Sequence, residues 1–377
     1  MTTPRGPLDL REYSLDGPGF PTRDLPAPPL PPTEPTVRKG RLVVMIDGVL
    51  EELETLTALP PGTGSMPLAL ITHGTSVDGS PDLNLRIFLP LAEQFARRGY
   101  RAVAFARRGV ATSTGQPVGR PRAACGSRKA RDYVEAANDI ANEYAAVLDA
   151  LVRLPEVDST RVVGVGQSTG GLGMLALAAR APPGLIGVIN FAGGHGGNGH
   201  YRVCNARALT RAFEMFGRVA RVPALWLYST ADRFFWPSLT RANFDAYVAG
   251  GAPARLQMLG SLWYAEDGHE LFQLGGRELW QPRISAFLRD IGAPGWRLDP
   301  AWAIVAKPSP PTGLEPAAHT AWLRYLGRAG HKAFAVGDNG WGWATGRPDR
   351  EEAEKAALAF CEEYTKGCRV VRHSGQP

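Results

Sequence analysis

The chain has 377 residues, of which 44% are hydrophobic and 21% are charged, and its formal net charge is +6. This length and composition predict a globular protein with one large domain and a smaller one. The charge follows from arginine usage without Lys/Arg clusters among aromatic residues, so nucleic acid is not an expected partner, and the basic stretch 120–131 is interpreted as a solvated loop or an anion-facing rim.

Neither a membrane span nor a signal peptide is predicted. No run of 18 apolar residues is present, and the first nine residues lack the apolar core of a signal peptide. The four cysteines are Cys125, Cys204, Cys361 and Cys368. Their even number is compatible with reduced cytosolic thiols and with two disulfides.

Residues 1–38 are rich in proline, with six prolines between positions 26 and 35. Such a segment cannot form a regular element, and we expect an extended N-terminal segment. Two apolar runs at 42–46 and 52–59 then flank Asp47-Gly48. This pattern predicts an antiparallel hairpin.

From residue 68 onward, short runs of apolar residues alternate with longer amphipathic stretches. The runs predict strands at 68–72, 101–106, 161–165, 185–192, 224–228 and 254–259. The stretches predict helices at 87–98, 132–154, 172–181, 205–217, 239–250 and 279–291. This alternation predicts an α/β fold for residues 39–292, with a doubly wound, mostly parallel sheet covered on both faces.

The rest of the chain is interpreted as a linker and an appendage. Residues 293–318 contain many prolines and no clear periodicity, which predicts a linker. Residues 319–377 are expected to form a small C-terminal α+β appendage. Its one predicted helix covers 349–364 and has Pro348-Asp349 as its start signal.

The pentapeptide Gly166-Gln167-Ser168-Thr169-Gly170 matches the pattern G-x-S-x-G. The bare pattern is weak evidence, but here it follows a predicted strand and precedes a predicted helix. A serine at such a turn must adopt a strained backbone, and the flanking glycines allow close packing. The context therefore predicts that Ser168 is a nucleophile.

A serine nucleophile needs a histidine base and a carboxylate that orients the histidine. In folds with this turn the chain order is serine, acid, histidine. Asp232 directly follows the strand 224–228, at the edge where parallel sheets place their sites. Of the seven histidines, only His269 follows such an acid and precedes the linker. The alternatives are a helix N-cap for Asp232 and a solvated surface position for His269.

The oxyanion of the tetrahedral intermediate needs two backbone N–H donors. We assign one to Thr169, directly after the nucleophile at the positive end of a helix. We assign the other to Thr75, in the turn His73-Gly74-Thr75 after an earlier strand. His73 itself is interpreted as structural.

Further residues near these motifs are candidates for substrate binding. Arg107, after the strand 101–106, is equally suited to hold a substrate anion or to brace a loop. The aromatic residues close to Asp232 and His269 are pocket walls or core residues; they are Phe234, Phe235, Trp236, Trp263 and Tyr264.

These motifs resemble the α/β-hydrolase superfamily over about residues 40–292, and most closely its dienelactone-hydrolase-like and prolyl-oligopeptidase-like branch. The resemblance rests on His73-Gly74, the Ser168 pentapeptide, Ser229-Thr230-Ala231-Asp232 and Gly268-His269. It implies an esterase-like serine hydrolase without a cofactor. Dienelactone hydrolases themselves use a cysteine nucleophile, so the resemblance does not imply a lactonase.

The C-terminal appendage is similar to small cysteine-pair modules of secreted bacterial proteins. On this basis Cys361 and Cys368 are expected to form a short disulfide, and one histidine nearby, His373, is too little for a zinc site. Cys125 and Cys204 lie in two predicted loops near the site, and we hypothesise that they pair. Paired cysteines favour a periplasmic or secreted protein, while a cytoplasmic location stays open.

The function expected from the sequence is hydrolysis of small or medium carboxylic esters by Ser168, Asp232 and His269, with a small-molecule ester as the partner. One alternative is an aminoacyl-peptidase or amidase, in which Glu266 and Asp267 would bind the amino end of the substrate. The other is a non-catalytic hydrolase-like binding protein.

Overall fold

The computed structural model describes residues 12–23, 25–26, 34–62, 64–119, 133–312 and 314–373. The strands of the large sheet are β1 (Tyr13–Asp16), β2 (Thr36–Ile46), β3 (Val49–Leu59), β4 (Met66–Thr72), β5 (Arg101–Phe105), β6 (Val157–Gln167), β7 (Leu185–Phe191), β8 (Ala224–Ser229) and β9 (Ala254–Leu259). The helices around it are α1 (Leu89–Arg97), α2 (Tyr133–Val152), α3 (Thr169–Ala178), α4 (Ala206–Val219), α5 (Pro237–Ala249) and α6 (Arg277–Asp290), with short 3-10 helices η1 (Leu85–Phe88), η2 (Gly268–Glu270), η3 (Leu274–Gly276) and η4 (Pro300–Ala303). No helix in the described part of the chain is long and apolar enough to cross a membrane.

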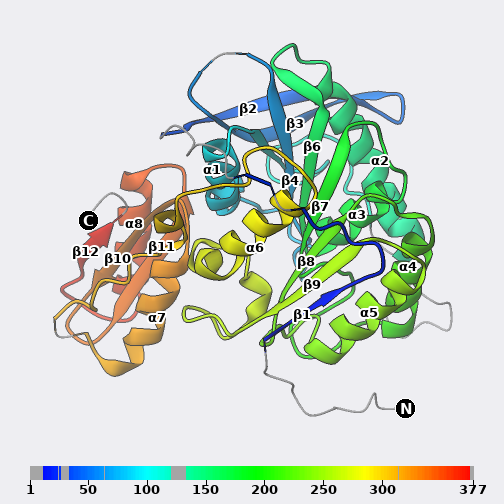
Figure 1. The fold of residues 1–377 in the computed structure, drawn as a ribbon. Helices are drawn as coiled ribbons and strands as arrows, with labels where there is room; N and C mark the ends of the chain where they lie inside the picture. Colours follow the sequence, from blue (N-terminus) through cyan, green and yellow to red (C-terminus); the bar gives the residue numbers. More distant parts are fainter. Residues whose placement is uncertain are drawn as a thin grey trace.

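The large sheet has the strand order β1-β9-β8-β7-β6-β4-β5-β3-β2 (Figure 1). Its six central strands, from β9 to β5 in that order, run parallel, whereas β3 is antiparallel to β5 and β1 is antiparallel to β9. The predicted doubly wound, mostly parallel sheet is therefore confirmed. The predicted hairpin is also confirmed, because Asp47 and Gly48 join β2 to β3 with φ angles of 52° and 80°, as a two-residue hairpin turn requires.

Helices cover both faces of this sheet, as the fully buried strands require. Helices α2, α3, α4 and α5 pack on one face, where Tyr144, Leu175 and Phe213 belong to one apolar core. Helices α1 and α6 pack on the opposite face, where Phe95 and Phe287 belong to a second core. The two cores hold the central strands rigidly, so the loops at the strand ends have fixed starting points.

The prediction that residues 1–38 contain no regular element is wrong for two segments. Tyr13–Asp16 forms β1, which pairs with β9 at the edge of the sheet, and β2 begins at Thr36. In β1, Tyr13 and Leu15 are partly buried while Ser14 and Asp16 are exposed, an alternation that suits an edge strand. The prolines are concentrated after this segment, so they do not prevent pairing with the open edge of β9.

The C-terminal part of the chain forms a second, three-stranded sheet with two helices. Its elements are α7 (Pro316–Gly327), β10 (His331–Val336), β11 (Trp341–Arg347), α8 (Arg350–Glu362) and β12 (Arg369–His373), and the strand order is β11-β10-β12. We call residues 316–373 the C-terminal module. Helix α8 was predicted, but α7 was not. Pro316 occupies the first turn of α7, and the sequence pattern placed this proline in the predicted linker.

The two helices cover opposite faces of the small sheet. Ala353, Ala357 and Cys361 of α8 pack on one face, while Trp322 and Tyr325 of α7 pack against Phe334 on the other. The predicted disulfide between Cys361 and Cys368 is present and ties the end of α8 to the start of β12. Cys204 is also disulfide-bonded, and its predicted partner, Cys125, lies outside the described residues.

Candidate active site

The loops that carry the predicted site residues meet at the carboxyl edge of the parallel strands. His73 follows β4, Ser168 follows β6 and Asp232 lies shortly after β8. His269 lies in η2, in the loop between β9 and α6. In the sheet, β5 lies on one side of β4 and β6 lies on the other, so the order in which strands are added reverses at β4. Such a reversal opens the crevice in which α/β sheets bind ligands.

Ser168 stands at a strained turn between β6 and α3. Its φ and ψ are 54° and −123°, a conformation that non-glycine residues rarely adopt, and the residue is 8% exposed. A Cβ on Gly166 would overlap the carbonyl of Gly170, and a Cβ on Gly170 would overlap the carbonyl of His73. Glycine is therefore required on both sides of the turn, which presents the serine at the head of α3.

Asp232 and His269 form a buried pair. The Oδ2 atom of Asp232 lies 3.2 Å from Nδ1 of His269. The other carboxylate oxygen accepts hydrogen bonds from the backbone amides of Phe234, at 2.7 Å, and Phe235, at 2.9 Å. These two amides fix the carboxylate, and the carboxylate in turn orients the imidazole so that Nε2 lies on the side of the ring away from Asp232.

Opposing effects set the pKa of His269. Burial lowers it, but the charge and hydrogen bond of Asp232, together with the charges of Asp267 and Glu270, raise it more. The pKa therefore lies above the ordinary value of histidine. The ring of Phe234 stacks on the imidazole at a centroid distance of 4.2 Å and covers one of its faces.

Thr75 and Thr169, the two predicted oxyanion residues, lie side by side next to Ser168. Their hydroxyl oxygens are 2.9 Å apart. The amide of Gly74 donates to Oε1 of Gln167, so this donor is already engaged. The amide of Thr169 belongs to the first turn of α3, where backbone N–H groups have no partner within the helix.

The side chain of Arg107 holds the loop that carries Gly74 and Thr75. Its Nη2 atom donates to Oγ1 of Thr75, at 2.8 Å, and to the carbonyl of Gly74, at 3.1 Å. Of the two roles that the sequence left open, these contacts match a brace for the loop. Arg107 is 3% exposed, yet it also lines a pocket beside Ser168.

His73 is a structural histidine in this arrangement. Its Nε2 accepts a hydrogen bond from the amide of Arg107, so Nδ1 carries the proton and donates it to the carbonyl of Gly74. Burial and the charge of Arg107 lower its pKa to about 3. The neutral ring holds the loop after β4 against the loop after β5.

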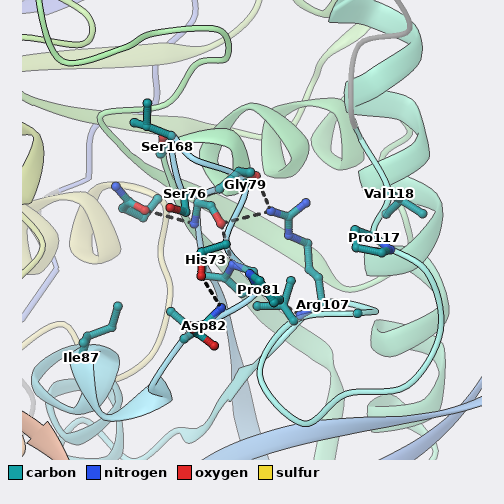
Figure 2. A pocket seen from close by; sticks show the side chains of 18 of the residues that line it. His73, Ser76, Gly79, Pro81, Asp82, Ile87, Arg107, Pro117, Val118 and Ser168 are labelled. Atoms are coloured by element: carbon teal, nitrogen blue, oxygen red, sulfur yellow. Dashed lines mark hydrogen bonds between the residues drawn. The ribbon is translucent and has the colours of Figure 1, made fainter.

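Two pockets open on either side of Ser168, and both are also lined by Thr75 and Phe234. The histidine-side pocket has a volume of about 290 Å³ and is further lined by His269 and Leu83. Arg107, Ile87, Pro117 and Val118, labelled in Figure 2, line it as well. The glycine-loop pocket has a volume of about 580 Å³ and is further lined by Thr169, Gly196, Gly197, Tyr201, Arg202, Val203, Phe235 and Trp236. The serine thus lies between two spaces of different size.

The structure brings only some of the predicted substrate-binding residues to these pockets. Arg107, Phe235 and Trp236 line one pocket or the other, whereas Trp263 and Tyr264 line neither. Tyr264 is buried and donates its hydroxyl to the carbonyl of Glu270, and Trp263 lies against Lys307. Both residues precede η2 and point toward the C-terminal module, so closeness to His269 along the chain was misleading for them.

Phe234, which the sequence left open as a pocket wall or a core residue, is a pocket residue. It lines both pockets and stacks on His269. The signal for it was its place two residues after Asp232, where its amide binds the carboxylate and its ring turns toward the histidine. No group of three or more metal-binding side chains occurs in the described ranges of the chain.

Comparisons with known proteins return distant structural likenesses. No protein-family profile matches the chain, and no curated protein sequence matches it. Among solved structures, a dienelactone hydrolase-like promiscuous phosphotriesterase from metagenomic libraries is similar, with 20% identity and a TM-score of 0.42, over 60% of this chain and 82% of that one. An esterase of Pyrococcus furiosus gives 14% identity and a TM-score of 0.47, over 71% of this chain and 98% of that one.

A putative dipeptidyl aminopeptidase IV of Bacteroides ovatus is similar as well, with 16% identity and a TM-score of 0.42. The match covers 59% of this chain and 32% of that one. The strand order, the parallel centre of the sheet and the turn at Ser168 agree with the resemblance that the sequence motifs indicated. The chain has the α/β-hydrolase fold. Since one fold carries many reactions, the chemistry has to be argued from the site itself.

Proposed function

We propose that this protein is a serine hydrolase that cleaves carboxylic esters of small or medium size through an acyl-enzyme on Ser168. The observation that carries the proposal is the meeting, in one cleft, of a strained serine and a buried Asp232–His269 pair. A serine becomes a nucleophile when an oriented imidazole can accept its proton. The backbone amides of Thr75 and Thr169 supply the oxyanion donors of this proposal.

In the proposed reaction, Oγ of Ser168 bonds to the carbonyl carbon and its proton passes to Nε2 of His269. Asp232 stabilises the imidazolium that forms, and the two amides stabilise the oxyanion. The bond between the carbonyl carbon and the alcohol oxygen then breaks, and His269 returns the proton to that oxygen. A water molecule, deprotonated by His269, releases the acid from Ser168 by the same steps.

The two pockets suit the two sides of an ester. The alcohol oxygen must receive its proton from His269, so the alcohol group belongs in the histidine-side pocket. The acyl group then belongs in the glycine-loop pocket, which Thr169 lines and which has about twice the volume. Aromatic side chains line this larger pocket, and they favour apolar acyl groups.

The contacts of Glu266 and Asp267 favour the ester over the aminoacyl amide. Asp267 accepts hydrogen bonds from the amides of Arg233 and His269, and Glu266 forms ion pairs with Arg233 and Arg324. Neither carboxylate lines either pocket. An amino group of a substrate would therefore have to compete with partners that these carboxylates already have.

We further propose a periplasmic or secreted location for this enzyme. The support is the disulfide between Cys361 and Cys368, since disulfides persist in oxidising compartments. Thiol titration of the denatured, unreduced protein checks it: we expect no free thiol, and four free thiols would contradict the oxidised state.

Replacing the nucleophile tests the function. In Ser168→Ala we expect hydrolysis of p-nitrophenyl acetate and butyrate to fall by at least about 10³-fold, because the acyl-enzyme cannot form. The circular dichroism spectrum and the melting temperature should stay close to those of the wild type, since the side chain of Ser168 makes no capping hydrogen bond to α3. Retention of most of the activity in this variant would sink the proposal.

A further inference from the structure

The loop that carries His269 is held from outside by helix α7 of the C-terminal module. Glu270 directly follows His269, and its Oε1 lies 2.7 Å from Nη2 of Arg328, at the end of α7. The side chains of Arg328 and Glu270 are 23% and 32% exposed, so the pair is partly shielded from solvent. Partial burial strengthens an ion pair compared with one in full contact with water.

A second contact joins the same two segments. The hydroxyl of Tyr264 donates to the carbonyl of Glu270 at 2.6 Å, which fixes the backbone beside His269. The ring of Tyr264 lies against Gly327, where a Cβ would overlap it. The last residue of α7 is thus a glycine at a point where the histidine loop packs against this helix.

A third contact links α7 to the loop that carries the acid. Arg324 of α7 lies 3.3 Å from Glu266, and Glu266 also lies 3.5 Å from Arg233, the residue after Asp232. These side chains are largely exposed, and such pairs contribute little each. The stronger tie is therefore the one between Arg328 and Glu270.

Arg328 is itself anchored within the C-terminal module. Nζ of Lys332 on β10 donates to the carbonyl of Arg328 at 2.7 Å, and to the carbonyls of Tyr325 and Leu326 at 2.9 and 3.0 Å. These bonds hold the end of α7 on the small sheet. A displacement of the module would therefore move the guanidinium that binds Glu270.

We propose that Arg328 is a positioning residue, whose ion pair with Glu270 fastens the His269 loop to α7 and makes the C-terminal module part of the catalytic apparatus. This inference rests on the proposed function, because it assigns a role through His269. It goes beyond that function because it gives the C-terminal module a role in the reaction. The histidine must stay aligned with Asp232 on one side and Ser168 on the other, and a small misplacement of a catalytic group costs rate.

Charges around His269 provide a readout that a purely structural role would not move. The acidic groups that act on it are Asp232, from the loop after β8, and Asp267 and Glu270, from its own loop. The guanidinium of Arg328 pairs with Glu270, whereas that of Arg233 pairs with Glu266, and Asp267 accepts a hydrogen bond from the backbone amide of Arg233. Removing the charge of Glu270 should lower the pKa of His269. Removing Arg328 leaves the charge of Glu270 unopposed and should raise it.

The test compares Arg328→Gln, Glu270→Gln and the double variant in the intact chain, with p-nitrophenyl butyrate as substrate. We expect kcat to fall about tenfold in each single variant, because the loop loses the same tie in both. The double variant should be no slower than the slower single variant, since both changes remove one interaction. The acidic limb of the pH profile should move to lower pH in Glu270→Gln and to higher pH in Arg328→Gln.

Arg241→Gln is the matched control. It removes an exposed ion pair with Asp245 on α5 and should change neither kcat nor the pH profile. Unchanged kcat in both test variants, additive losses in the double variant, or acidic limbs that stay or move in one direction would overturn the proposal. If Arg328→Gln does not fold, the nearly isosteric Glu270→Gln carries the test alone, through its kcat and its acidic limb.

The Ser168→Ala variant separates the two proposals. If the wild type shows no hydrolysis that depends on Ser168, the proposed function fails. If that hydrolysis is present but the variants of Arg328 and Glu270 behave like the control, only the role of the C-terminal module fails.

Discussion

The chemistry of the site depends on the environment of one imidazole. His269 is buried between Asp232 and the ring of Phe234, and the surrounding carboxylates outweigh the effect of burial on its pKa. A base must be neutral to accept a proton from Ser168. Ester hydrolysis should therefore rise with pH through a pKa that lies above about 6.5, the ordinary value of histidine.

Removing the carboxylate that orients His269 tests this reading. In Asp232→Asn we expect kcat to fall about 10³-fold or more, because the imidazole loses its tautomer control and its counter-charge. The acidic limb of the profile of kcat/KM should move to lower pH, because the charge that raises the pKa of His269 is gone. Stopped-flow or steady-state rates between pH 5 and 9 would measure both effects. An acidic limb that stays in place in this variant would contradict the assignment of Asp232.

Secondary structure elements position the site, and loops shape its pockets. Strands β4, β6 and β8 end at the same edge of the large sheet, so Thr75, Ser168 and Asp232 lie at one edge. The walls of the two pockets come mainly from the loop segments after β4, β5, β7 and β8. Substrate preference should therefore respond to single changes in these segments.

A matched pair of substitutions tests the division of the pockets. Val118 lines the histidine-side pocket and Val203 lines the glycine-loop pocket. We expect Val118→Phe to lower kcat/KM about tenfold for esters with long alcohols, and Val203→Phe to do so for esters with long acyl chains. Methyl acetate hydrolysis serves as the internal control and should change little. If the two variants show the same preference, the division of the pockets is wrong.

The strand and helix pattern was predictable to a large extent, and particular elements show where prediction stopped. The turn at Ser168, the hairpin at Asp47-Gly48 and the six parallel strands follow from local patterns that burial on both faces reinforces. Strand β1 could not be foreseen, because it forms only where the open edge of β9 accepts it. Trp263 and Tyr264 show the same limit for the site: sequence distance to His269 says nothing about the side on which a ring packs.

At the scale of the whole molecule, the C-terminal module is a small unit with a disulfide. Its sheet has three strands, and the bridge between Cys361 and Cys368 closes a short loop at the end of α8. A loop of this length is worth about 2.5 kcal/mol in the chain-entropy account of disulfides. We propose that this module begins at Pro316 and depends on the bridge for its stability.

Removing the bridge checks this dependence. In the double variant Cys361→Ser/Cys368→Ser we expect the free energy of unfolding of the C-terminal module to fall by about 2–3 kcal/mol. Hydrogen exchange on β10 and β12, with the large sheet as the internal reference, would resolve this local effect. Equal protection of the small sheet in the variant and the wild type would show that packing alone holds the module together.

The central claim is that Ser168 is the activated nucleophile, and labelling with a fluorophosphonate tests it most directly. The probe reacts with a serine that an adjacent base activates in an open cleft. The account predicts one adduct per chain, mapped by peptide mass spectrometry to Ser168, with parallel loss of ester hydrolysis. It also predicts no adduct in Ser168→Ala and strongly slowed labelling in His269→Ala. An unlabelled wild-type chain, or an adduct on another residue with loss of activity, would contradict it.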